Sequence, residues 1–300
     1  MTIESTRTPT EFRTGSFDPF QTRTPFEDGK VHDVDGIGLW CHDTGGTGEA
    51  IVLLGGFTAG HFVFDFVREH LAGYRIITWE PRGLGLSDAP DPEENEYSVN
   101  VWAQDLSRLL SVIGVEKAHL WADGFGGFIA MRLAAEHPEQ VQSVITSTEV
   151  WSRLQDRTKN WNIYSSIVEN LGTTGRGARL LAKWMDFEML PWFVSWEAAN
   201  IAEVLHLETV RATVGYGLLD ADIRSDLPRV KAPTLLLLGG GSGQEALAQP
   251  GVRQLRDNVE NLEIVVVEEA HESYGVVSHP REFAVAARAF FEAHAFPAHS

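Results

Sequence analysis

The sequence predicts an α/β protein with a mostly parallel central sheet, helices on both faces of the sheet and an inserted helical cap. Three observations support this fold class. Short apolar runs alternate with amphipathic stretches, as in proteins built from strands and crossover helices. The second observation is a long interval, residues 151–228, that contains no clear run of this kind. The 300 residues are 43% hydrophobic and 22% charged, which is enough for a sizeable core and ordinary for a globular protein.

Six apolar runs are short and rich in branched residues, which is typical of strands that are buried on both faces. Between them lie helical stretches such as residues 99–113, where apolar side chains recur every three or four positions. Helices that alternate with buried strands imply parallel pairing and right-handed crossovers. The expected strands are 50–54, 74–79, 118–121, 141–146, 234–238 and 262–267.

Two segments lie outside this alternation. Residues 1–30 are rich in Thr, Pro, Ser and charge without an apolar period, which favours an irregular N-terminal arm. Residues 151–228 contain no clear strand run but carry several tryptophans in helix-like sequence. We expect a helical cap there, between the sixth and seventh strands of the sheet. The α/β core then comprises residues 31–150 and 229–300.

The net charge, the cysteine content and the absence of metal-binding motifs limit the partners, compartment and cofactors that we expect. A net charge of −18 repels phosphate backbones and anionic lipid, and no basic run offsets it, so nucleic-acid and membrane partners are not expected. Cys41 is the single cysteine, and the first residues lack the pattern of a signal peptide, so we expect a cytoplasmic protein. No HExxH or CxxC spacing occurs, and we expect neither a metal nor a cofactor.

The stretch "HLWADGFGGFIAMRLAAEHPEQV" (119–141) has the pattern of a strand, a tight bend and a helix. At the apex of such a bend φ is positive, and the residues two before and two after must be small so that strand and helix can approach. Ala122 and Gly126 meet this requirement if Gly124 is the apex. Asp123 at the apex would place two aromatic residues in the small positions. We therefore assign the apex to Gly124, which carries no side chain.

This bend and three other landmarks, in the same order along the chain, resemble the α/β-hydrolase superfamily over about residues 30–295. The first is the strand and loop "IVLLGGFTAGHFVFDFV" (51–67), with Gly55-Gly56-Phe57 where the family has His-Gly-Phe. "YRIITWEPRGLGLSDAP" (74–90) is similar to Asp-x-Arg-Gly-x-Gly-x-Ser, with glutamate first. The stretch 119–141 resembles the nucleophile elbow, and 265–294 the last strand, histidine and helix.

The resemblance implies a degenerate catalytic triad. Gly124 stands where the family has a Ser, Cys or Asp nucleophile, and His271 stands where it has its general base. A histidine base needs an acid to orient it, and the usual position of that acid is Ser242 here. Glu149 is the candidate partner, by similarity to members that carry the acid after the sixth strand, and Glu245 is the reserve. The alternative for Glu149 is a helix cap.

The oxyanion hole of the family is formed by backbone N–H groups, which do not depend on the apex side chain. By resemblance the donors are Phe57, which follows Gly56, and Phe125. Asp123 has two interpretations: a carboxylate that binds turn amides, or an acid or base whose pKa is raised by burial. Cap tryptophans either line an apolar pocket or pack as plain helix core. The pocket candidates are Trp151, Trp184 and Trp192.

The first hypothesis is an enzyme acting on a small apolar or aromatic carbonyl-type substrate, an ester, a lactone or a C–C bond, by His general-base chemistry without a covalent serine intermediate. Non-hydrolytic lyase, isomerase or cofactor-free oxygenase chemistry is the alternative within that fold. The other hypothesis is an inactive binding protein, since N-myc-downstream-regulated proteins are similar in having glycine at the apex. A glycine introduced by design in place of a nucleophile would give the same sequence. The expected partner is a small molecule, and the sequence leaves a homodimer open.

Overall fold

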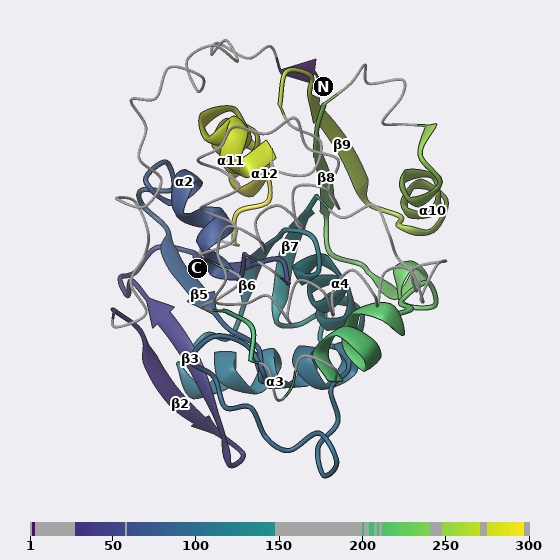
Figure 1. The fold of residues 1–300 in the computed structure, drawn as a ribbon. Helices are drawn as coiled ribbons and strands as arrows, with labels where there is room; N and C mark the ends of the chain where they lie inside the picture. The colour runs from purple at the N-terminus through teal and green to yellow at the C-terminus, as the bar shows by residue number, and fades with distance from the viewer. Residues whose placement is uncertain are drawn as a thin grey trace, which may run out of the picture.

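The computed structural model describes residues 2–3, 28–57, 59–147, 200, 204–206, 209, 212–240, 248–270 and 275–296. In these residues a nine-stranded sheet runs through the middle of the molecule, with the order β1-β9-β8-β7-β6-β4-β5-β3-β2 (Figure 1). The strands are β1 (Thr2–Ile3), β2 (Lys30–Val34), β3 (Ile37–Asp43), β4 (Ala50–Leu54), β5 (Arg75–Trp79), β6 (Ala118–Ala122), β7 (Val141–Thr146), β8 (Thr234–Gly239) and β9 (Leu262–Val267).

The sheet is mostly parallel. All pairings from β1 through β9, β8, β7, β6 and β4 to β5 are parallel, whereas β5–β3 and β3–β2 are antiparallel. The predicted mostly parallel sheet is therefore confirmed. In such a sheet the loops that follow the carboxyl ends of the strands meet along one edge, where binding sites are usually found. The loops after β4, β5, β6 and β7 are thereby brought together.

All six predicted strands are present, and 50–54, 141–146 and 262–267 have the predicted bounds. The β2–β3 hairpin was not predicted. Its two-residue turn is Asp35-Gly36, with φ of 54° and 85°, which is the backbone of a tight hairpin turn. An Asp-Gly pair between short runs is a known hairpin signal, so the sequence did contain this information. β2 is the edge strand, and its outer residues are exposed.

Helices cover both faces of the sheet (Figure 1). α3 and α4 pack together on one face, while α2, α11 and α12 lie on the other. The predicted helix over 99–113 is α3, and the Ser98 hydroxyl accepts a hydrogen bond from the Val101 amide at its N-terminus. The remaining bounds are η3 (His61–Phe64), α2 (Asp65–Arg68), α3 (Val99–Val112), α4 (Gly126–Glu136), η4 (Thr213–Leu219, a π-helix), η5 (Leu227–Arg229), α10 (Pro250–Asn258), α11 (Gly275–Ser278) and α12 (Pro280–Ala293).

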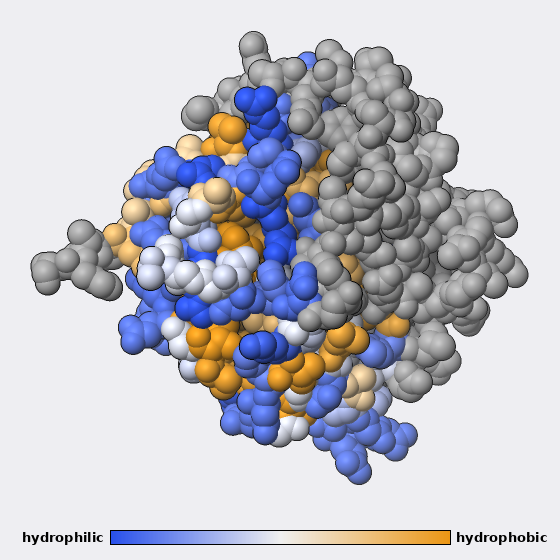
Figure 2. Space-filling view, turned by 90° about the vertical axis from the view of Figure 1, so that its left-hand side faces the viewer, coloured by the Kyte–Doolittle hydropathy of each residue, from blue (hydrophilic) through white to orange (hydrophobic). Residues whose placement is uncertain are grey.

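The hydrophobic core lies between the sheet and these helices. Every residue of β4, β6 and β8 is buried, as expected for central strands covered on both faces. Where described residues form the face in Figure 2, hydrophilic areas lie beside hydrophobic ones. Among the described helices none is long and apolar enough to span a bilayer.

The predicted arm and cap fall largely outside the described residues. Thr2–Ile3 pair in parallel with β9, and residues 4–27 are not described. Of the predicted cap, 151–228, the described parts include η4 and a short stretch that pairs with the core, because Leu84 and Leu205 form an isolated bridge. The Gly85 amide donates to the Val204 oxygen at 2.8 Å, so this part of the interval packs on the loop after β5.

Candidate functional site

The bend between β6 and α4 has the geometry that the sequence predicts. Gly124 has φ of 49°, and it is the one residue of 122–126 in the left-handed region. A Cβ built onto Gly126 would lie 2.2 Å from the Leu54 carbonyl oxygen, so helix and strand approach at a distance that only glycine allows. Ala122, on the other side of the apex, is fully buried. The two small residues therefore serve the close approach that was inferred for them.

The described neighbours of the apex leave space for a Cβ. A Cβ built onto Gly124 would meet one of their atoms within 4 Å, the Gly56 Cα at 3.7 Å, which is an ordinary van der Waals contact. Within the described part of the chain, crowding therefore does not require this glycine. Its φ of 49° is a conformation that glycine adopts without the strain of a larger residue.

The Asp123 carboxyl lies directly beside this space. It is 7% exposed, and its Oδ2 lies 3.6 Å from a Cβ built onto Gly56. Its Oδ1 accepts a hydrogen bond of 2.6 Å from the Ser147 hydroxyl, at the end of β7. Burial raises the pKa of Asp123 to about 6, and the Ser147 hydrogen bond opposes this rise only in part. A group with this pKa can exchange a proton near neutral pH.

The loop after β4 folds back on itself beside the bend. The Gly60 amide donates to the Gly56 oxygen at 3.0 Å, and the two residues form an isolated bridge. A Cβ on Gly55 would lie 1.7 Å from the Gly60 oxygen, so no larger residue fits there in this backbone. This tight turn brings Gly56, and Phe57 after it, next to Gly124.

The two candidate oxyanion donors are packed against each other. The rings of Phe57 and Phe125 meet edge to face with centroids 6.2 Å apart, and both side chains are buried. The Trp102 ring meets Phe125 in the same way at 5.0 Å. Phe125 immediately precedes α4, so its N–H belongs to a helix N-terminus, where amides lack intrahelical acceptors. The packing fixes the relative position of the two peptide groups.

A second buried carboxylate supports this loop from the side of β5. Glu80 is 1% exposed, and its Oε1 accepts a hydrogen bond of 3.1 Å from the His61 amide. The same oxygen forms a hydrogen bond with His61 Nδ1, and the His61 side chain is fully buried. Glu80 is the glutamate that departs from the family motif, whereas His61 was not predicted as a site residue. No spacing pattern marks this histidine, so its partner is evident from the fold alone.

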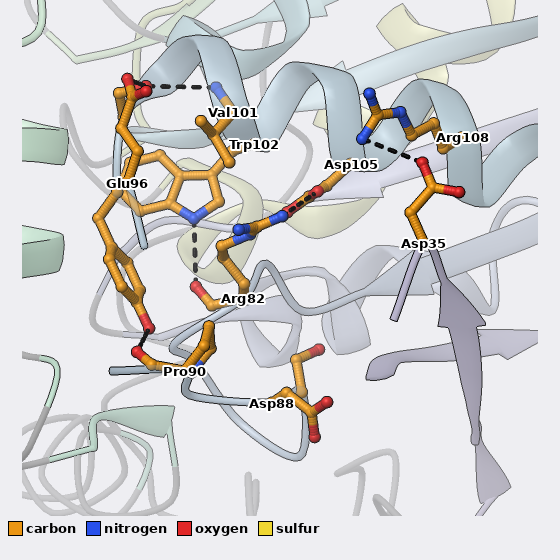
Figure 3. Close-up of polar contacts among 12 residues, drawn as sticks. Asp35, Arg82, Asp88, Pro90, Glu96, Val101, Trp102, Asp105 and Arg108 are labelled. Atoms are coloured by element: carbon orange, nitrogen blue, oxygen red, sulfur yellow. Dashed lines mark hydrogen bonds and ion pairs between the residues drawn. The ribbon is translucent and has the colours of Figure 1, made fainter. Parts of the chain in front are cut away.

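The loop after Glu80 is held by a separate set of contacts (Figure 3). Arg82 donates through two nitrogens to the buried Asp105 carboxylate, at 2.6 and 2.7 Å, and the Trp102 indole N–H donates to the Arg82 oxygen at 3.1 Å. Arg108 pairs with Asp35 on the surface at 3.2 Å. These contacts join the loop and the β2–β3 turn to α3.

Five of the predicted site residues are brought together by the structure: Gly56, Phe57, Asp123, Gly124 and Phe125. The others lie outside the described residues. These are the general base His271, the acid candidates Glu149 and Glu245, Ser242, and the pocket candidates Trp151, Trp184 and Trp192. Within the described part of the chain, no cluster of three or more His, Cys, Asp or Glu side chains is arranged to bind a metal ion.

Comparisons with known proteins agree with this geometry. Residues 49–162 match the family model of the alpha/beta hydrolase fold, an interval that includes β4 through β7 and the bend. N-formylmaleamate deformylase of Pseudomonas putida is 26% identical over 237 residues, which are 75% of this chain and 82% of that protein.

Two solved structures are similar throughout. One is Est816, described as an N-acyl homoserine lactone degrading enzyme, with a TM-score of 0.68 and 21% identity over 87% of this chain and 99% of that one. The other is the enol-lactonase of Burkholderia xenovorans LB400, with a TM-score of 0.69 and 20% identity over 87% and 99%. Together, the sheet order, the strand-bend-helix geometry, the family model and the similar structures show that this chain has the α/β-hydrolase fold.

Proposed function

We propose that this chain is an enzyme that hydrolyses a small apolar or aromatic carbonyl compound, an ester, a lactone or an activated C–C bond, by direct attack of water. The single observation that carries this proposal is the bend at Gly124. It has a positive φ at its apex, only an ordinary contact with the described residues at the Cβ position and a buried carboxyl beside it, but no nucleophilic side chain.

In the proposed reaction, His271 takes a proton from water while the water oxygen attacks the carbonyl carbon. The carbonyl oxygen becomes negatively charged and accepts hydrogen bonds from the N–H groups of Phe57 and Phe125. As the tetrahedral intermediate collapses, the leaving group receives the proton from the imidazolium. Glu149 orients His271, as a triad acid does. No bond forms between protein and substrate at any step.

The comparisons support a carbonyl substrate. The similar proteins include an N-formylmaleamate deformylase, and the similar structures include an N-acyl homoserine lactone degrading enzyme and an enol-lactonase; formyl groups and lactones both contain a carbonyl group. The net charge of −18 favours neutral substrates over anions near the site. The cap residues Trp151, Trp184 and Trp192 are the proposed apolar lining, which suits aromatic or alkyl groups.

The test compares wild type with His271→Ala on aryl esters, lactones and β-diketones. We expect kcat/KM to fall at least ~100-fold in the variant, because a general base contributes roughly 10² to 10⁴ in rate. His137→Ala is the matched control, since His137 is a partly exposed histidine at the C-terminal end of α4. An unchanged kcat/KM in His271→Ala would rule out the proposed mechanism.

A second experiment separates direct water attack from a covalent route. A fluorophosphonate probe labels an activated serine at a nucleophile elbow, and wild type should not be labelled within residues 119–141. Gly124→Ser should gain labelling there, because the built Cβ meets only an ordinary contact. Labelling of the wild-type bend would contradict the proposed reaction.

The glycine also favours a second candidate, a binding protein that retains the pocket without turnover. A relaxed turn with an intact loop and no nucleophile is what such a protein requires. Absence of wild-type activity on the whole panel, together with saturable binding of one of its compounds, would favour this function over the enzyme.

A further inference from the structure

The loop that carries Phe57 contacts the carboxylate of Glu80, the residue that directly follows β5. We propose that Glu80, acting through His61, is a positioning group that fixes the Phe57 N–H toward the substrate carbonyl oxygen. This inference rests on the proposed function for the substrate, but its structural part can be tested without activity.

The contacts run from Glu80 to the loop in two ways. Oε1 accepts from the His61 backbone N–H at 3.1 Å and also forms a hydrogen bond with the His61 imidazole. One carboxylate oxygen therefore holds both the main chain and the side chain of the residue that closes the loop. The Gly60 amide, one residue earlier, donates to the Gly56 oxygen, which joins this anchor to the peptide unit before Phe57.

The glycines show how closely the carboxylate approaches the loop. A Cβ built onto Gly60, which has φ of 54°, would lie 2.7 Å from Glu80 Oε1. The carboxylate thus occupies the place that a side chain would need, directly against the loop backbone. With Gly55 equally crowded by the Gly60 oxygen, the turn has little freedom while Glu80 remains in place.

Glu80 is itself immobilised by the strands behind it. Its amide donates to the Trp40 oxygen on β3 at 3.1 Å, and its own oxygen accepts from the Ser87 hydroxyl at 2.6 Å. The Trp40 amide donates to the same Ser87 hydroxyl oxygen at 2.9 Å. The Trp40 ring stacks on His61 with centroids 4.8 Å apart. The anchor is therefore rigid on both sides of the carboxylate.

Two other buried carboxylates, Asp105 and Asp226, show what an ordinary structural role is in this chain. Asp105 pairs with Arg82, and Asp226 pairs with Arg132 and Arg229. Their described partners are arginines. Glu80 differs because it accepts from the backbone of the loop that holds the candidate oxyanion donor. This difference distinguishes positioning from simple burial of charge.

The experiment uses the full-length protein with Glu80→Ala, Glu80→Gln and the matched control Asp226→Asn. Amide hydrogen exchange is followed by mass spectrometry in peptides that cover residues 55–61 and, for reference, 118–136. We expect exchange in 55–61 to accelerate at least ~10-fold in Glu80→Ala, with the reference peptide unchanged. Glu80→Gln should be intermediate, because its amide oxygen can still accept from the His61 N–H.

Kinetics with 4-nitrophenyl acetate and a lactone give the second measurement. Misplacing a group by about 1 Å can cost ~100-fold in rate, so we expect kcat to fall ~100-fold in Glu80→Ala with KM within ~3-fold of wild type. Glu80→Gln should recover part of this loss. Asp226→Asn should lower the melting temperature without changing kcat of the folded protein.

Equal exchange of 55–61 in Glu80→Ala and Asp226→Asn would overturn the proposal, and so would a kcat that follows the folded fraction alone. If Glu80→Ala does not fold, Glu80→Gln carries the comparison. If wild type hydrolyses none of the probes, the proposed function fails, and the exchange measurement by itself decides whether Glu80 holds the loop.

Discussion

Replacing Asp123 by asparagine should stabilise the protein near neutral pH. Asp123 is 7% exposed, and burial raises its pKa from 3.8 to about 6. Each pKa unit corresponds to about 1.36 kcal/mol, so the charged carboxylate costs the folded state about 3 kcal/mol above pH 6. Asparagine has the same shape and never carries this charge, and its side-chain oxygen can still accept from the Ser147 hydroxyl.

The direction of the pH dependence follows from the number of protons that the folded and unfolded states bind. Between pH 4 and 6 the folded protein keeps a proton on Asp123 that the unfolded chain has released, so the free energy of unfolding falls as pH rises through this window. The contribution is fully present below about pH 4 and lost above about pH 6. Asp123→Asn should therefore have nearly wild-type stability at pH 4 and exceed it by about 2 to 3 kcal/mol at pH 7.5.

Urea unfolding, followed by tryptophan fluorescence at both pH values, measures this difference. All other acids titrate alike in the two proteins, so their contributions cancel in the difference between the two free energies of unfolding. Ser147→Ala is the companion variant: its lost hydrogen bond no longer lowers the pKa of Asp123, so its stability should fall more steeply with pH than that of wild type. A difference between wild type and Asp123→Asn that is the same at pH 4 and pH 7.5 would refute a raised pKa.

Three other predictions concern the glycines of the bend, a buried ion pair and a buried thiol. Gly126→Ala should lower the free energy of unfolding much more than Gly124→Ala. The Cβ at position 126 would meet a backbone oxygen at 2.2 Å, whereas the Cβ at position 124 costs roughly 1–2 kcal/mol because of the positive φ there. Chemical denaturation of both variants measures the difference. Arg82→Ala should cost about 3–5 kcal/mol because it leaves the buried Asp105 charge without its bidentate partner, and the double variant to alanine should recover part of that loss. Burial raises the pKa of Cys41 to about 12, so iodoacetamide at pH 8 should alkylate it in urea but not in the native protein.

The central fold was predictable because buried parallel strands leave a strong pattern. Runs such as Val141–Thr146 are apolar, short and separated by helical periodicity, and their bounds agree with the structure. The β2–β3 hairpin was missed because its edge strand is exposed and not continuously apolar. Its signal was the turn dipeptide Asp35-Gly36 rather than hydrophobicity.

The candidate site was predictable where backbone geometry constrains residue size. Ala122 and Gly126 could be placed on either side of the bend because strand and helix cannot approach over larger residues, and their spacing placed Gly124 at the apex. Long-range partners were not predictable in this way. The contact of Ser147 with Asp123, and that of His61 with Glu80, join residues of loops that follow different strands, and their separation along the chain has no characteristic value.

The two buried carboxyls beside the loop after β4 have different environments, and this difference assigns them different roles. Glu80 accepts from a backbone N–H and contacts an imidazole, which suits a fixed anchor. Asp123 receives one hydroxyl hydrogen bond among the described contacts, and its pKa of about 6 allows it to change protonation under physiological conditions. A charged Asp123 next to Gly56 would repel an oxyanion held by the Phe57 amide, whereas the protonated acid would not. We therefore infer that the protonation state of Asp123 matters to the chemistry at Gly124, and that the hydrogen bonds of Glu80 fix the shape of the loop.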